Sequence, residues 1–217
     1  MNTRWIDENR DQIWQLTSHH AVLGIIPVVV SLVLSVPLGW WAHRSRTARR
    51  LLVPGASILY ALPSLPLFVL LPLILGTKIL DPINVIAALT LYGNALLVRT
   101  ATDAFDSVGR SVRRDAVAMG YSNPQVFWRV ALPLAVPAIT AGMRVVSAST
   151  LSLVSVGALI GVPSLGYFFT DGYQRSFPTE IWVGIIGTLV LAIIFDLVIV
   201  AVGRLLTPWQ RRKGESA

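Results

Sequence analysis

The residue types that could carry covalent chemistry are few in this sequence, and their spacing supports no catalytic site. There is no cysteine, which excludes disulfides, thiolate metal sites and cysteine nucleophiles. The three histidines, His19, His20 and His43, do not stand at the i, i+4 spacing of a helical zinc site. No Gly-Lys dipeptide occurs, so a phosphate-binding loop of the Walker type cannot form. We therefore expect a non-catalytic chain that itself binds no cofactor and no metal.

Two charged residues stand deep inside apolar runs. Arg144 lies ten residues beyond Leu134, near the start of one run, and Asp196 lies ten residues before Leu206, at the end of another. At the helical rise, each would lie about 15 Å deep. Because unpaired charges in hydrocarbon are costly, we expect the two to form an ion pair or to line a water-filled pathway together. The alternative is that each satisfies backbone or hydroxyl groups separately.

The elements that must position these residues are long apolar helices. The chain has 217 residues, of which 54% are hydrophobic and 13% charged. Its apolar runs are continuous and reach the length needed to cross hydrocarbon, which favours helices over a membrane barrel. We predict an all-α integral membrane protein with one transmembrane domain, residues 21–206. Its five transmembrane helices are expected at residues 21–42, 51–75, 83–102, 130–160 and 181–206.

The distribution of Lys and Arg predicts the orientation. Thirteen of these residues fall on one side of the predicted membrane and four on the other, with Arg144 inside a span. Positive residues accumulate in cytoplasmic connections, so the N-terminus is expected outside and the C-terminus in the cytoplasm. The net charge of +7 is thus a topology signal and not a nucleic-acid footprint.

Three of the segments outside the predicted spans have an expected structure or location. Residues 1–20 carry apolar side chains at helix-compatible spacings with charges between them, and are expected to form an external amphipathic segment, with a solvated tail as the alternative. Residues 103–129 form a loop on the cytoplasmic side, and residues 207–217 a cytoplasmic tail. Within the second span the prolines are dense and are expected to kink the helix: Pro54, Pro63, Pro66 and Pro72.

The loop between the third and fourth spans has its own predicted structure. Residues 110–119 lack Gly and Pro and can form a short helix. Gly120 is suited to end that helix in a left-handed cap. Asn123 and Pro124 then turn the chain, and residues 125–130 return to helix. The pattern predicts a short helix that projects from the membrane.

This loop resembles the signature loop of the permease subunits of ABC importers: E-A-A, three residues, Gly, nine residues, Ile, one residue, Leu-Pro. Gly120, Val130, Leu132 and Pro133 match at the family spacing. The E-A-A positions are Arg114, Asp115 and Ala116, so an Arg replaces the leading acid. The resemblance implies a MetI-like bundle whose short coupling helix docks on a separate ATPase subunit.

Three further runs are similar to the osmoprotectant permeases of this family. Tyr60-Ala-Leu-Pro-Ser-Leu-Pro-Leu67 resembles Q-T-I-P-S-L-A-L, and Ala158-Leu-Ile-Gly-Val-Pro-Ser-Leu-Gly166 resembles A-L-I-G-A-G-G-L-G. Leu134–Arg144 is also similar. The resemblance implies a translocation pathway for a small osmoprotectant such as glycine betaine, choline or carnitine.

The resemblance also implies partners and a location. These are cytoplasmic ATPase subunits that hold ATP and Mg²⁺, a second permease copy or sister permease, an external substrate-binding protein, and membrane lipid. The chain itself would be a multi-pass protein of the bacterial plasma or inner membrane.

Aromatic and polar side chains within or near the spans are candidates for the substrate pathway, because quaternary ammonium groups favour aromatic faces. They are Tyr60, Tyr92, Asn94, Ser149, Ser152 and Tyr173. Two other functions stay open at this point. One is an ABC permease for methionine or another amino acid. The other is a proton-coupled secondary transporter with Asp196 as proton carrier, which would leave the loop spacing unexplained.

Overall fold

The structure is a computed structural model that describes residues 3–209, apart from the Arg110 side chain. Every regular element in that range is a helix. The long helices are α2 (Arg10–Arg44), α5 (Pro82–Ser107), α8 (Leu132–Gly157) and α10 (Pro178–Leu206). The shorter ones are α1 (Thr3–Glu8), α3 (Arg46–Ala61), α4 (Ser64–Leu75), α6 (Arg110–Ala118), α7 (Asn123–Val126) and α9 (Tyr167–Gln174). A π-helical turn, Phe127–Ala131, precedes α8, and a 3-10 turn, Ala158–Ile160, follows it.

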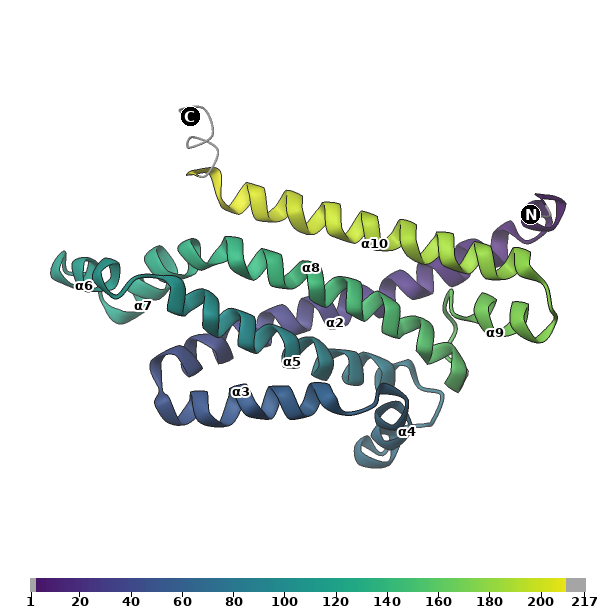
Figure 1. Cartoon of the computed structure of the whole chain (residues 1–217), viewed down its shortest axis with the longest axis horizontal. Helices are drawn as coiled ribbons and strands as arrows, with labels where there is room; N and C mark the ends of the chain where they lie inside the picture. Colours follow the sequence, from purple (N-terminus) through teal and green to yellow (C-terminus); the bar gives the residue numbers. More distant parts are fainter. Residues whose placement is uncertain (1–2, 210–217) are drawn as a thin grey trace.

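The all-helical membrane fold predicted from the sequence is confirmed. Four helical segments are long and apolar enough to span a membrane: α2, α5, residues 123–160 and α10. The pair α3 and α4 supplies a fifth span if it is counted as one broken span. In Figure 1 the spans form an elongated bundle, with α6 and α7 at one end and α9 at the other. We refer to these as the α6 end and the α9 end.

The second span differs from the single run expected at residues 51–75. It divides into α3 and α4, whose axes are bent by 108°. Proline chemistry explains the break, because neither Pro63 nor Pro66 has an N–H to donate to the preceding turn. The carbonyl of Leu62, four residues before Pro66, instead accepts a hydrogen bond of 2.6 Å from the Tyr92 hydroxyl on α5.

The first helix also differs from expectation. It does not begin near residue 21, because α2 starts at Arg10 and continues without interruption to Arg44. The separate N-terminal element is only α1, and Trp5 within it packs edge-on against Phe168 and Phe177, with ring centroids 6.1 and 5.6 Å apart. Residues 10–20 therefore continue the helix of the first span, while α1 packs against the α9 end. Residues 1–2 of the predicted N-terminal segment and 210–217 of the predicted tail lie outside the described part of the chain.

Helix α5 lies at the centre and α10 at the edge. In the most apolar stretch of α5, 56% is buried inside the protein, whereas in the most apolar stretch of α10 only 6% is buried. Small residues let the central helices approach closely, since a Cβ on Gly93 would collide with Ser31 of α2, and one on Gly142 of α8 would lie 2.6 Å from Thr100. The exposed face of α10 must be covered by lipid or by another subunit.

Candidate functional site

Helix α6 projects from the bundle between α5 and α8 (Figure 1), and its C-terminus has the geometry expected from the sequence. Gly120 has φ of +87°, the left-handed region. The Tyr121 N–H donates to the Ala116 carbonyl at 3.1 Å, and the Gly120 N–H to the Val117 carbonyl at 2.9 Å. This pair of hydrogen bonds is a Schellman motif, which ends the helix and satisfies its last carbonyls.

The chain then re-enters helix in two steps. The Ser122 N–H donates to Gln125 Oε1 at 2.8 Å, which fixes the first turn of α7. A π-helical turn follows instead of the regular helix expected at residues 125–130, and the Leu132 N–H bonds back to the Phe127 carbonyl. Pro133 has no N–H to donate to the Arg129 carbonyl, so a regular α-helix would lack one hydrogen bond at this point. The π-helical turn lies at the same position.

The signature-loop residues separate into buried and exposed positions. Ala116 is 1% exposed and lies on the face of α6 that is buried against the rest of the protein. Arg114, Asp115 and Gly120 are exposed, while Leu132 and Pro133 are half-buried at the start of α8. The loop therefore exposes a charged surface to solvent, and its opposite surface packs against the bundle.

A polar network that the sequence did not reveal fastens α6 to the spans. Arg113 donates to His43 Nε2 at the end of α2, and His43 Nδ1 lies 2.6 Å from Asp106 Oδ1 at the end of α5. Arg49 of α3 pairs with the other Asp106 oxygen. Because a guanidinium only donates and a carboxylate only accepts, His43 must be neutral with its proton on Nδ1. One imidazole thus links the projecting helix to two spans.

Sequence reasoning missed this network because its members carry no spacing signal. His43 and Asp106 are 63 residues apart, and His43 and Arg113 are 70 residues apart. The available hint was position, since these polar residues all lie on the same side of the predicted membrane.

Arg144 and Asp196 form the ion pair expected between the fourth and fifth spans. Arg144 Nε lies 2.5 Å from Asp196 Oδ1, and Nη2 lies 3.0 Å from Oδ2. This two-bond geometry is the strongest that Arg and a carboxylate adopt. The side chains are 51% and 37% exposed, so the pair faces outward from this chain. The environment of this ion pair depends on whether lipid or another subunit covers that face of the protein.

Comparison with known proteins places the chain in a family. The model of the family "Binding-protein-dependent transport system inner membrane component" matches residues 31–212, which include α6, the Gly120 turn and Pro133. The chain belongs to this family. It is accordingly a MetI-like permease of the multi-pass inner-membrane type. Membership of this family disfavours the alternative that the chain is a proton-coupled secondary transporter.

Two curated relatives illustrate the similarity. The chain is 26% identical over 211 residues to the glycine betaine/carnitine/choline transport system permease protein OpuCD of Bacillus subtilis, covering 97% of this chain and 91% of that one. It is 32% identical over 162 residues to the ergothioneine transport permease/ergothioneine binding protein EgtU of Helicobacter pylori. That match covers 75% of this chain but only 28% of the longer relative.

A solved structure supports the fold. An inward-facing crystal form of the MetNI methionine ABC transporter matches with a TM-score of 0.77 at 17% identity, covering 90% of this chain and 96% of that chain. At this identity the match concerns the fold alone.

The pathway residues expected in this permease lie on four different helices. Tyr60 of α3 and Tyr92 of α5 are in edge-to-face contact at 6.3 Å, and Tyr60 is exposed while Tyr92 is buried. Asn94 bonds within the bundle, accepting from Ser35 and donating to the Thr90 carbonyl, both at 2.8 Å. The remaining residues are distributed over two other helices: Ser149 and Ser152 on α8, and Tyr173 on α9.

The α9 end of the permease is held by a second charged cluster. Arg175 Nη1 lies 3.0 Å from Asp171 Oδ2 and 3.1 Å from Glu180 Oε1. The hydrogen bond to Asp171, with the charge of Glu180, raises the pKa of the Arg175 guanidinium. The cluster joins α9 to the start of α10. Within residues 3–209, no group of three His, Asp or Glu side chains is placed to hold a metal ion.

Proposed function

We propose that this chain is the non-catalytic permease subunit of an ATP-driven importer, and that α6 is its docking helix for a separate ATPase subunit that binds ATP and Mg²⁺. The observation that carries the proposal is the exposure of α6. Val112, Val117 and Met119 are 41%, 56% and 71% exposed, beside the charged Arg114 and Asp115. Apolar side chains at the tip of a projecting helix fit a groove in a partner protein.

The proposed orientation places α6 in the cytoplasm and the N-terminus outside. The thirteen-to-four distribution of Lys and Arg supports it, although three of the thirteen, Arg211, Arg212 and Lys213, lie outside the described residues. Reporter fusions at Lys78, Ser122 and Gly172 should report outside, inside and outside. An external signal from Ser122 would overturn both the orientation and the docking role of α6.

We propose a small quaternary ammonium compound as substrate, delivered by an external binding protein. Glycine betaine, carnitine and choline, named in the description of the Bacillus relative, share this group. The methionine importer resembles the chain in fold only, so the sequence relatives decide the proposal. Within this permease, the exposed Tyr60 ring at the break of α3 and α4 can offer its face to such a cation.

A second permease, identical or a sister chain, completes the proposed pathway. The exposed Arg144–Asp196 pair and the largely unburied α10 support this, because charges facing lipid are unfavourable. Between two bundles the pair would meet another subunit or a water-filled pathway.

Transport in proteoliposomes tests the function. The permease is reconstituted with its neighbouring ATPase and binding protein, and uptake of labelled glycine betaine, choline, carnitine and methionine is measured with and without internal ATP. We expect ATP-dependent uptake of a quaternary ammonium compound that survives a proton ionophore. Methionine uptake alone would refute the substrate class, and uptake that needs only the proton gradient would refute the importer.

A further inference from the structure

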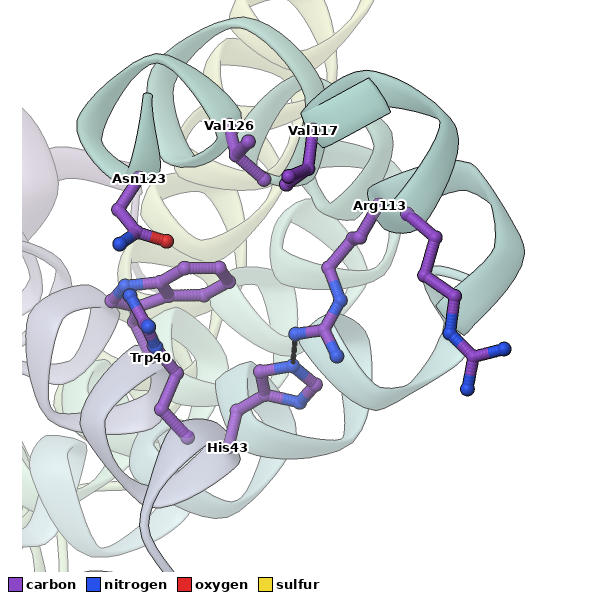
Figure 2. Close-up of a pocket in the computed structure, with 8 residues that line it drawn as sticks. Trp40, His43, Arg113, Val117, Asn123 and Val126 are labelled. Carbon is purple, nitrogen blue, oxygen red and sulfur yellow. Dashed lines mark hydrogen bonds between the residues drawn. The ribbon is translucent and has the colours of Figure 1, made fainter. Parts of the chain in front are cut away.

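A basic cavity lies at the α6 end, between the last turn of α2 and the helices α6 and α7. Its volume is about 480 Å³, and Arg44, Arg113 and Arg114 all line it. Figure 2 shows Trp40 and His43 on its α2 side, with Asn123 and Val126 opposite. No Asp or Glu of residues 3–209 lines this cavity. Three guanidinium groups without an acid in the lining give the cavity a positive charge that favours an anion.

Hydrogen bonding within the cavity is incomplete. One Arg113 amino group donates to His43, as the dashed line in Figure 2 marks. The Arg113 Nε–H is buried and has no hydrogen-bond partner among the described residues. A buried charged donor without an acceptor is unfavourable, and an anionic oxygen would satisfy it. Arg44 lies over the Trp40 ring, 5.8 Å from its centroid, which holds that guanidinium at the cavity wall.

A large apolar groove opens from the same place. It has a volume of about 1360 Å³ and runs between α2, α8 and α10. Trp40, Arg44 and Asn123 line both the basic cavity and the groove, so the two lie side by side. On α2 the groove extends from Arg44 to Ile25, about 28 Å at the helical rise. That length exceeds one leaflet of a hydrocarbon core of roughly 30 Å.

We propose that these two cavities together bind one anionic phospholipid of the leaflet at the α6 end. The phosphate lies in the basic cavity against Arg44, Arg113 and Arg114, and an acyl tail lies in the apolar groove along α2. Basic pockets between transmembrane helices bind anionic lipid head groups by this chemistry. The position of the apolar groove directly beside the basic cavity favours a lipid over a free anion or an acidic loop of a partner protein, since neither of those has a tail to fill the groove.

The proposed lipid also has a structural consequence. Its phosphate would contact α2 through Arg44 and α6 through Arg113 and Arg114, beside the His43–Asp106 network. The lipid therefore reinforces the attachment of α6 to the bundle. This inference does not depend on the identity of the transported substrate.

Native mass spectrometry of the purified full-length chain tests the site. The detergent-solubilised protein is titrated with palmitoyl-oleoyl phosphatidylglycerol or phosphatidylcholine, and apparent affinities are compared. We expect phosphatidylglycerol to bind at least tenfold more tightly. Loss of one surface guanidinium weakens anionic-lipid binding about fivefold, so the double variant Arg44→Gln, Arg114→Gln should lose about 25-fold. The matched control Arg46→Gln, Arg50→Gln removes the same charge from exposed positions outside the cavity and should stay within twofold.

A second pair of variants tests the tail. Val33→Trp fills the groove from an exposed position, and should weaken phosphatidylglycerol binding at least fivefold without changing any charge. Val22→Trp, on the same helix and outside the groove, should have no effect. The proposal is overturned if both arginine pairs weaken binding equally, if the two lipids bind alike, if Val33→Trp binds as wild type, or if millimolar inorganic phosphate displaces the lipid completely.

Discussion

Replacement of Gly120 by valine isolates the role of the turn that ends α6. Gly120 has φ of +87°, and no atom outside its chain neighbours lies within 4 Å of the Cβ that a substitution would add. Steric collision with the rest of the protein is therefore absent. The cost of a side chain at this position comes from backbone conformation alone.

That cost can be placed on a scale. A left-handed residue other than glycine costs roughly 1–2 kcal/mol, and a β-branched side chain such as valine falls at the upper end. If the variant relieves this strain, the Gly120 and Tyr121 N–H groups leave the Val117 and Ala116 carbonyls. Such a cost changes the equilibrium between intact and open turn by a factor of about 5–30. Because Gly120 is exposed, water can satisfy the freed groups, so the protein should still fold and insert.

Coupling between ATP hydrolysis and uptake is the informative measurement. In proteoliposomes that contain the ATPase and binding protein, Gly120→Val should retain ATP hydrolysis but transport less substrate per ATP. Gly120→Asn should be mildest and Gly120→Ala intermediate, because asparagine tolerates the left-handed region best. Hydrogen exchange of the Gly120-region amides, measured by mass spectrometry, should accelerate in the same order.

Gly109 provides the matched control in the same loop. Its φ is −51°, and an added Cβ would meet no atom closer than 3.5 Å. Gly109→Ala should therefore leave the coupling ratio within about twofold of wild type, since it adds a side chain without left-handed strain. Wild-type coupling in Gly120→Val, or an equal loss in Gly109→Ala, would refute the role assigned to the left-handed turn.

Two further predictions concern the spans. Arg144→Ala and Asp196→Ala should each lower the amount of assembled transporter, and the exchange Arg144→Asp with Asp196→Arg should restore part of it; additive losses without rescue, measured by gel filtration of the complex, would contradict the ion pair. Tyr92→Phe removes the hydroxyl that bonds to the Leu62 carbonyl and should lower the free energy of unfolding by about 1–3 kcal/mol, whereas Tyr60→Phe, at an exposed position, should change it little; equal effects in denaturant titrations would count against this hydrogen bond.

The sequence by itself determined the membrane class, the approximate spans and the Gly120 turn. Continuous apolar runs leave a chain in lipid only helical solutions, because each backbone polar group must be satisfied within its own segment. The cap at Gly120 was predictable because left-handed backbone favours glycine through purely local sterics. Depth made the Arg144–Asp196 pair one of two predicted arrangements, because opposite charges at equal depth in two spans can meet, and the structure contains the pair.

Element boundaries depended on contacts that a linear pattern does not contain. The break between α3 and α4 falls at Pro63, although Pro54 and Pro72 lie inside helices. Proline content alone could not distinguish these positions. The break is where Tyr92, from another helix, supplies the missing hydrogen bond to Leu62. Likewise, the helix α2 begins at Arg10, and the preceding α1 is placed by contacts of the Trp5 ring with Phe168 and Phe177 at the α9 end.

Only the tertiary structure decided how the polar residues at the α6 end are used. His43, Asp106 and Arg113 come from three elements, and no local rule relates residues 63 and 70 positions apart. The basic cavity has the same origin, because Arg44 and Arg114 line one volume only after α2 and α6 are packed together. Local sterics and solvation act along the chain and can be inferred from it. Cavities and long-range networks arise from the relative placement of whole helices, which the sequence specifies only through the folded bundle.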